Sequence, residues 1–446
     1  MANPNPYLTT GAYRAVWRWH FYAGLLVLPV LCLMALTGAL YLFKDEIDAA
    51  VYAPWERVPA GGDWASPDRW VVAASVGAGG RVVNVRVPDR PDRAVRLTVR
   101  RPDGALRTAF VNPHDSQYLG AVRYGGLTEI IKRTHSLTIV GPWANLLVEI
   151  VAGWAIILVA TGIFLWWPRR RDAGVLTVRA TPPAGRPFWR DVHAVTGLYA
   201  GAVIAFLVVT GMPWSAVWGD RFLGLVRETG LGRPPAPAAA SPWIHVDHAD
   251  HPAAVGWTMQ GVALHAGHQP GSSSLGQVLR TAEAESMARP YTVTIPDDPD
   301  LAWTLAHESK RVQDARSLYV GGADGAVRAD IRYDQFGVGA RAFEWGVAVH
   351  QGTQYGRINR YVMLSGCIAV WMLAISALVM WWKRRPNGRL GAPVAPPGPR
   401  VRAAVLGIVL PLAIIYPMTG LSLLAALAFD RLTRLIRRPA QGHAHK

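Results

Sequence analysis

Five long apolar segments constrain this 446-residue chain more than any other feature of its sequence. They cover about residues 18–43, 143–167, 190–218, 361–382 and 401–429. About 20 consecutive apolar residues in a helix cross a bilayer, so each segment is long enough to span one. Because the first segment is longer than a signal-peptide core and LFKDEIDAA follows it without a good cleavage site, we expect it to be retained.

Lysine and arginine gather at one side of these predicted helices. They precede the first helix, fill the connection 168–189 and follow the fourth helix. Cytoplasmic loops carry the excess of basic residues, so these parts and the N-terminus are predicted to be cytoplasmic and both long insertions to lie outside. Topology and attraction to anionic lipid headgroups therefore account for the net charge of +16, and we expect no nucleic-acid partner.

The fifth segment admits two interpretations. A single crossing would place the basic tail outside, against the charge rule, whereas Pro411, Pro417 and Gly420 could break the segment into a re-entrant piece. We favour one crossing because each half alone is short.

The fold class predicted is a polytopic α-helical membrane protein with a four-helix transmembrane core, a fifth hydrophobic segment and two α+β insertions. VVNVRV, AVRLTVRR and LRTAFVNP in the first insertion, and YTVTIP and SLYVGGADGAVRADIRY in the second, have the alternation typical of strands. The predicted parts are an N-terminal tail with the first helix (1–43), an insertion (44–142), the second helix (143–167), a cytoplasmic loop (168–189), the third helix (190–218), the second insertion (219–342), the fourth helix with its approach (343–382), a cytoplasmic loop (383–400), the fifth segment (401–430) and a basic tail (431–446).

A histidine occurs twice at the same place on an apolar helix, in WRWHFYAGLL and in WRDVHAVTGLYAG. His20 precedes Gly24 by 4 residues and Gly38 by 18, and His193 precedes Gly197 and Gly211 by the same offsets. His135 precedes Trp166-Trp167 by the same offsets with which His350 precedes Trp381-Trp382. The insertions repeat as well, since Phe110-Val111 and Tyr319-Val320 lie 209 residues apart. These matches predict a tandem duplication, with two parallel halves.

Duplication predicts histidines in pairs, His20 with His193 at the inner level and His135 with His350 at the outer level. Two facing imidazoles at each of two levels are typical of bis-histidine haem b in a four-helix bundle, hence two haems per chain. The alternative is that each histidine is only a polar anchor at the membrane interface.

Small and basic residues accompany these histidines. Gly24 and Gly197 lie on the face of the inner histidines, and Gly38 and Gly211 lie on that face about 27 Å further along. They could make room for haem or allow close helix packing. Arg18 and Arg190 could pair with haem propionates or with lipid headgroups.

The second insertion also holds HVDHADH and HAGH. Their histidines could chelate a transition metal, which would suit a metal transporter, but we favour a solvated polar loop because Pro242 and Pro252 interrupt regular spacing. The histidines are His245, His248, His251, His265 and His268.

The chain resembles the PepSY-associated transmembrane family over nearly its whole length. The resemblance is carried by WRWHFYAGLLVLP, RTAFVNPHDSQYLG, THSLTIVGPWANLLVEIVAGWAIILVATGIFLWWPRR, WRDVHAVTGLYAG and YPMTGLSLLAALAFDRL. Members of the family include inner-membrane reductases of ferric siderophores with b-type haems and PepSY-like periplasmic domains. The resemblance implies a bacterial inner-membrane location, PepSY-like insertions, and haem ligation by His20, His135, His193 and His350.

We therefore predict an oxidoreductase that carries electrons through two b-type haems to a periplasmic ferric siderophore or other ferric chelate, for iron acquisition. The cytoplasmic segments are too short for a flavin or nicotinamide domain, so the donor is expected to be a separate cytoplasmic protein or a membrane quinol. The alternative is a non-redox periplasmic module that binds a ligand or partner.

Overall fold

The computed structural model describes residues 6–167, 176–179, 185–234, 243–245, 257–259, 262–267, 271–385, 410–411 and 414–436. The chain forms two compact units, each built from segments that are far apart in the sequence. The first unit comprises residues 1–39, 134–222 and 362–446, and the second comprises residues 40–133 and 223–361.

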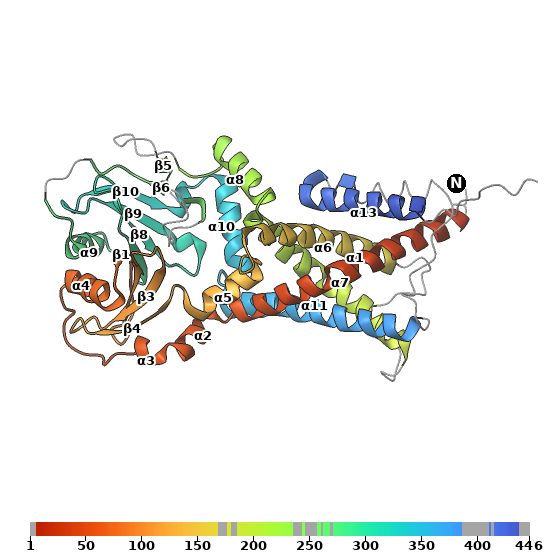
Figure 1. The fold of residues 1–446 in the computed structure, drawn as a ribbon, viewed down its shortest axis with the longest axis horizontal. Helices are drawn as coiled ribbons and strands as arrows, with labels where there is room; N and C mark the ends of the chain where they lie inside the picture. Colours follow the sequence, from red (N-terminus) through yellow and green to blue (C-terminus); the bar gives the residue numbers. More distant parts are fainter. Residues whose placement is uncertain are drawn as a thin grey trace, which may run out of the picture. The chain divides into compact units, whose positions relative to one another are not determined.

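The first unit is a bundle of long helices (Figure 1). Its main members are α1 (Pro6–Tyr41), α6 (Asn145–Trp166), α7 (Arg186–Gly211) and α11 (Gly356–Arg384). Four stretches are long and apolar enough to cross a membrane: Tyr13–Tyr41, Pro142–Trp166, Arg186–Trp214 and Gly356–Arg384. Between 11% and 50% of the most apolar part of each stretch is buried within the protein, so at least half of it is free to contact lipid. The four-helix core predicted from the sequence is confirmed.

Two small apolar clusters hold the bundle together. Val27 of α1, Trp154 of α6 and Leu423 of α13 (Pro417–Ile436) share one cluster. Ile204 of α7 and Val370 of α11 share another with α1. Short 3-10 turns, Pro142–Ala144 and Met212–Trp214, adjoin α6 and α7, and α8 (Trp218–Glu228) follows the second of them.

The predicted fifth crossing is not among these spans. In the described part of that segment, α13 has only the short apolar stretch Pro417–Ala426, and residues 401–409 lie outside the described residues. Glu149 of α6, which is fully buried, accepts hydrogen bonds from the backbone N–H of Val217, Trp218 and Met418. This carboxylate therefore connects the start of α13 to α6.

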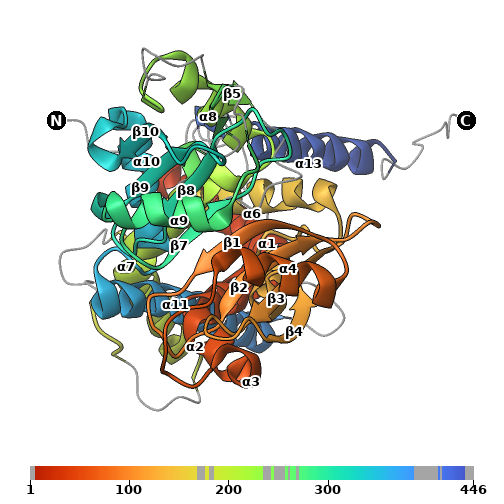
Figure 2. The same cartoon turned by 90° about the vertical axis from the view of Figure 1, so that its left-hand side faces the viewer.

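The second unit contains one antiparallel sheet of eight strands in the order β10-β9-β8-β7-β1-β2-β3-β4 (Figure 2). The predicted strands form, and two further ones, β4 and β8, complete the sheet. The strands are β1 (Arg81–Val87), β2 (Val95–Arg100), β3 (Leu106–Val111), β4 (Tyr118–Arg123), β7 (Tyr291–Thr294), β8 (Trp303–His307), β9 (Arg316–Val320) and β10 (Val327–Arg332), with a separate pair β5 (Ile244–His245) and β6 (Val262–Ala263).

The two insertions share this sheet, where the sequence analysis expected an α+β domain in each. β1 of the first insertion pairs with β7 of the second, with Val85 opposite Val293. A half-sheet alone would expose β1 or β7 as an unpaired edge, and pairing satisfies the N–H and C=O groups of both.

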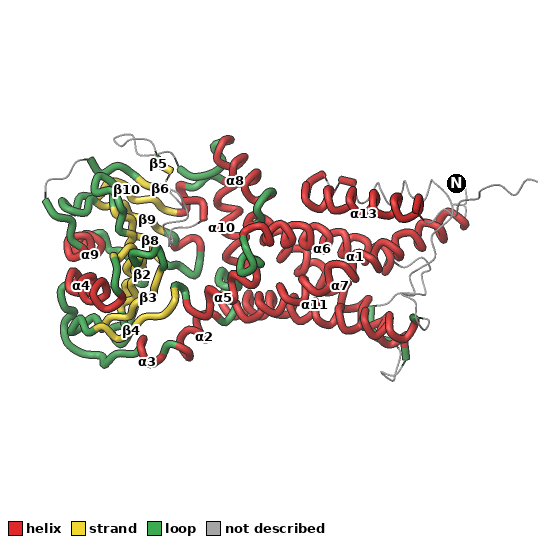
Figure 3. The backbone as a smooth tube through the Cα atoms, viewed as in Figure 1, coloured by secondary structure: helices red, strands yellow, loops and turns green. Residues whose placement is uncertain are grey.

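Helices cover one face of the sheet (Figures 2 and 3). α4 (Pro67–Ala78) and α9 (Leu275–Ala284) bury Trp70 and Leu279 against the valines and leucines of the central strands. Strand residues alternate between faces, so on the central strands the other face carries polar side chains such as Arg86 and Thr98, whereas Phe110 and Tyr319 lie in separate apolar clusters. The remaining helices of this unit are α2 (Lys44–Val51), α3 (Ala53–Glu56), α5 (Gly126–His135), α10 (Val338–His350) and the 3-10 turns Trp257–Met259, Val312–Asp314 and Tyr333–Gln335.

Candidate cofactor site

The two inner histidines face each other inside the helix bundle. His20 lies on α1 and His193 on α7, their ring centroids are 6.4 Å apart, and the ring planes meet at 86°. A bond from metal to imidazole nitrogen is about 2 Å, which puts two rings on opposite sides of one metal ion at roughly 6 Å between centroids. The spacing thus suits two imidazoles that would hold one metal ion between them.

A hydroxyl of a third helix fixes the tautomer of His20. Its Nδ1 lies 2.9 Å from Thr161 Oγ1 on α6. The Thr161 hydroxyl already donates to the carbonyl of Ile157 at 2.6 Å, so it accepts the hydrogen bond from His20. Nδ1 therefore carries the proton, and Nε2 keeps its lone pair for a metal.

His193 is oriented in the same way by α11. Its Nδ1 lies 3.1 Å from the carbonyl oxygen of Leu373 and 3.0 Å from Ser376 Oγ. A carbonyl only accepts, and Ser376 donates to the carbonyl of Met372 at 2.7 Å. His193 also presents an unprotonated Nε2.

The outer histidine of the first unit follows the same rule. His135, at the end of α5, has its Nδ1 3.1 Å from Thr37 Oγ1, and Thr37 donates to the carbonyl of Leu33 at 2.8 Å. Burial lowers the pKa of His135, although a backbone hydrogen bond to Met34 opposes the shift, so the neutral imidazole is favoured. Thr37 lies 17 residues beyond His20 on α1, about 26 Å along a helix.

His350, the predicted partner of His135, belongs to the second unit and ends α10. Asn359 Nδ2 donates to the carbonyl of the adjacent Val349 at 2.9 Å, and Gly352 adopts a φ of +73° just beyond the helix. The outer pair stays a prediction of the sequence repeat.

The four glycines singled out from the sequence differ in their surroundings. A Cβ on Gly38 would lie 3.3 Å from His135 Cε1, so this glycine makes room for the imidazole. Cβ atoms on Gly24 and Gly197 would meet Leu158 and Leu373 at ordinary distances of 3.9 and 3.7 Å. Gly211 ends α7. Of these, Gly38 is the one shown in contact with a histidine.

The two arginines expected beside a propionate have partners within the protein. Arg18 lies over the ring of Tyr22, with its guanidinium carbon 5.1 Å from the centroid. Arg190 Nη2 lies 3.0 Å from the buried carboxylate of Asp191, which Arg179 also contacts. Arg190 is thus already neutralised in part.

The histidine-rich loop is only partly described. His248, His251 and His268 lie outside the described residues, as does the side chain of His245. His265 is exposed, and its backbone pairs with Leu301. Among the described residues, no three His, Cys, Asp or Glu side chains gather as metal ligands.

The sequence analysis missed Thr161 and Ser376 as functional residues. They lie 215 residues apart, the offset that relates His135 to His350, so the repeat contained the signal. A hydroxyl at both equivalent positions, one helix away from each inner histidine, is the feature that identifies them.

The family model described as PepSY-associated TM region matches residues 17–384. The matched segment includes all four histidines and most of both units. No curated protein matches the chain.

Proposed function

We propose that this chain, which belongs to the PepSY-associated transmembrane family and is a multi-pass membrane protein, is a haem-b oxidoreductase that reduces a periplasmic ferric chelate. Haem, when bound, would supply one-electron transfer. The donor would be a cytoplasmic protein or a membrane quinol, which is oxidised as iron(III) becomes iron(II). Hard-oxygen chelators such as siderophores hold iron(II) less tightly, so reduction would release the metal for iron acquisition.

One observation carries the proposal: the imidazoles of His20 and His193 face each other at 6.4 Å between helices α1 and α7. Two further helices orient these rings, because Thr161 of α6 accepts from His20 Nδ1 and Ser376 of α11 accepts from His193 Nδ1. Such hydrogen bonds fix ring direction and raise the basicity of a metal ligand. An interfacial anchor would need neither the facing geometry nor the shared tautomer.

The proposal includes the tandem duplication. Thr37 and Thr210 are equivalent positions 173 residues apart, the offset of His20 and His193. Both hydroxyls donate to the carbonyl four residues earlier, of Leu33 and Phe206. By this symmetry His135 and His350 would hold a second haem, with PepSY-like insertions in the periplasm and the N-terminus in the cytoplasm of a bacterial inner membrane.

The test is an absorption spectrum of the purified full-length protein, oxidised and dithionite-reduced, with haem quantified per chain. We expect two low-spin b-type haems per chain. His20→Ala and His193→Ala should each lower the count to one, and His350→Ala should remove the other haem. His265→Ala, outside the bundle, serves as the matched control and should keep both.

A complete lack of haem after expression with ample haem supply would overturn the redox proposal. The second candidate, a non-redox ligand-binding module, would then gain weight, and a polar cavity in the second unit favours it. Retention of both haems in His20→Ala would contradict the ligand assignment while leaving haem binding itself intact.

A further inference from the structure

The second unit contains a cavity of about 250 Å³ on the sheet face that α4 and α9 leave uncovered. Its walls include Arg86 of β1, Arg96 and Thr98 of β2, and Asp48 and Tyr52, from α2 and the residue after it. The volume lies below the roughly 300 Å³ at which sites for drug-sized ligands begin. The cavity therefore suits a molecule of a few heavy atoms.

Two arginines face each other across the strands at this cavity. Arg86 and Arg96 are direct register partners on β1 and β2. Like charges directly opposite each other destabilise a sheet unless acids compensate them. The pair β7–β8 is related to β1–β2 by a local two-fold axis between Val85 and Val293. The positions that correspond to Arg86 and Arg96 are then Thr294 and Thr304, which also lie opposite each other. The sheet can thus form without arginines there.

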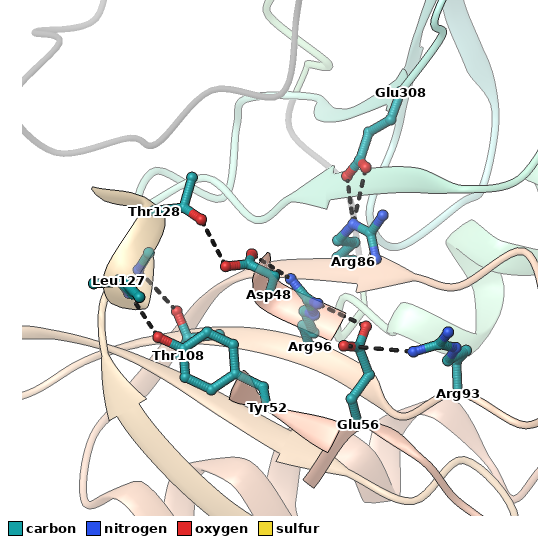
Figure 4. A network of polar contacts seen from close by, with 11 residues as sticks. Asp48, Tyr52, Glu56, Arg86, Arg93, Arg96, Thr108, Leu127, Thr128 and Glu308 are labelled. Carbon is teal, nitrogen blue, oxygen red and sulfur yellow. Dashed lines mark hydrogen bonds and ion pairs between the residues drawn. The ribbon is translucent and has the colours of Figure 1, made fainter. Parts of the chain in front are cut away.

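Acidic side chains compensate these charges and leave several donors unused (Figure 4). Both oxygens of Glu308 accept from Arg86 Nε, at 2.9 and 2.8 Å, and Arg96 Nη2 donates to Glu56 at 2.6 Å. Within the part of the chain that the structure describes, the two Nη groups of Arg86 have no hydrogen-bond partner. Arg96 Nε is buried and likewise has no hydrogen-bond partner among the described residues.

An acceptor lies beside these donors. Asp48 Oδ1 accepts from Thr128 at 2.6 Å, while Asp48 Oδ2 lies 3.6 Å from Arg96 Nη1, beyond hydrogen-bond distance. Tyr52 Oη accepts from the backbone N–H of Leu127 at 2.6 Å, which leaves its proton to donate. The cavity thus offers guanidinium donors and a carboxylate acceptor side by side.

The ion-paired side chains at the cavity balance in charge without a ligand. Three arginines, Arg86, Arg93 and Arg96, meet three carboxylates, Asp48, Glu56 and Glu308. A ligand with net charge would leave one charge uncompensated in a partly buried site, which is costly. A ligand that carries one charge of each sign would keep the balance.

We propose that this cavity binds a small zwitterion of the size of a free amino acid. The carboxylate would accept from the Nη groups of Arg86 and from Arg96 Nη1, and the ammonium group would donate to Asp48 Oδ2. An α-amino acid carries these two groups on one carbon, which matches a donor and an acceptor 3.6 Å apart. The site uses no residue of the histidine pairs and is independent of haem.

The test begins with equilibrium dialysis of the full-length protein in detergent against an equimolar mixture of the twenty L-amino acids, read by mass spectrometry. The amino acid that is retained best is then titrated calorimetrically, together with its α-amide and its deaminated acid. We expect the amino acid to bind and each analogue to bind at least about tenfold more weakly, because each leaves one charged group of the site without its partner.

Variants test the residues. Arg86→Gln and Asp48→Asn should each weaken binding at least about tenfold. Arg100→Gln, on the same strand as Arg96 but outside the cavity, should bind like the wild type. Because Arg86→Gln leaves Glu308 uncompensated, the double variant Arg86→Gln with Glu308→Gln, which removes the whole ion pair, shows whether lost binding merely reflects lost folding. It should keep the wild-type melting temperature and still fail to bind.

Three outcomes would overturn the proposal: retention of no amino acid, equal binding of the deaminated acid, or an equal loss in Arg100→Gln and Arg86→Gln. The first would leave the arginines as a structural ion network on the sheet face. The second would show that the site recognises an anion only.

Discussion

At the residue scale, a hydroxyl from a neighbouring helix lies against Nδ1 of His20, His135 and His193 and sets the direction of each ring. The Thr161→Val variant keeps the shape of the side chain and removes the acceptor for His20 Nδ1. Loss of the hydrogen-bond partner of a metal-binding histidine typically lowers the affinity for the metal about 10- to 100-fold. If the proposed inner haem site is correct, haem titrated into the apoprotein should bind there more weakly by that factor, measured from Soret absorbance.

The matched control for Thr161→Val is Ser365→Ala. Ser365, on α11, is exposed and donates to the carbonyl of Val362 in its own helix. Its replacement should leave haem affinity unchanged. Equal affinities for Thr161→Val and the wild type would show that the hydroxyl does not orient the ring.

Gly38 provides a steric test at the outer level. In Gly38→Ala the new Cβ would lie 3.3 Å from His135 Cε1, tighter than ordinary contacts, so the imidazole must shift by a few tenths of an ångström. If the proposed haems are bound, we expect the outer one to be lost or to become high-spin and the inner one to be unchanged, in the reduced-minus-oxidised spectrum.

Gly24→Ala is the control, since its Cβ would meet Leu158 at 3.9 Å, an ordinary distance. A normal spectrum in Gly38→Ala, or the same loss in both variants, would argue that these glycines serve helix packing alone. The sequence repeat identified Gly38, but it could not separate Gly38 from Gly24, because the difference depends on which side chain of another helix lies opposite.

At the element scale, Glu149 holds the ends of three helical segments together. Its carboxylate accepts hydrogen bonds from three backbone N–H groups at the start of α8 and of α13. Gly153, on the same helix as Glu149, leaves room for the Thr419 side chain. In Glu149→Gln an amide NH₂ would face N–H donors, which costs about 1–3 kcal/mol for the group left unsatisfied. We expect faster hydrogen exchange in α13 and a lower melting temperature in detergent.

Glu344→Gln makes the same change at a buried carboxylate of the second unit, which accepts from Thr258. It should leave hydrogen exchange in α13 unaltered. Unchanged exchange of α13 in Glu149→Gln would mean that apolar packing around Leu423 is sufficient to hold this helix.

The β9–β10 pair is stabilised by an ion pair that depends on pH. Burial raises the pKa of Asp330, but hydrogen bonds and charge from Arg316 and Arg332 outweigh it, and the net pKa is lowered. A folded-state pKa below the unfolded value stabilises the fold above the unfolded pKa, and this contribution is lost as pH falls through the folded pKa. We expect Asp330→Asn to lower the free energy of unfolding by about 1 kcal/mol at neutral pH.

The difference in the free energy of unfolding between Asp330→Asn and the wild type should shrink when the pH is lowered to about 3, below the ordinary aspartate pKa of about 4. Thermal melts of both proteins at the two pH values measure it. The exposed Asp334→Asn controls for the general effect of removing a carboxylate. A difference that persists undiminished in acid would exclude ionisation of Asp330 as its source.

At the scale of the whole molecule, the long helices were predictable and the shared sheet was not. An apolar run of 20 residues is a local property, since backbone groups in lipid must bond within their own helix. The pairing of β1 with β7 joins residues more than 200 positions apart, and alternation within each strand says nothing about its neighbour. For the same reason the ion pair between Arg86 and Glu308, which lie 222 residues apart, could not be predicted from the sequence.

Orientation in the membrane is the remaining prediction at this scale. The basic residues at the N-terminus and after Trp382 predict that both insertions, and with them the amino-acid-sized cavity, face the periplasm. In a background without Cys32 and Cys367, single cysteines can replace the exposed residues Ala60, Ser272 and Lys383. An impermeant thiol reagent added to cells with a permeabilised outer membrane should label the cysteines at 60 and 272, while the cysteine at 383 should react only after lysis. Labelling of position 383 before lysis would show the opposite orientation. The proposed reduction of a ferric chelate would then have to take place on the cytoplasmic side, and iron(II) would be released there without crossing the membrane.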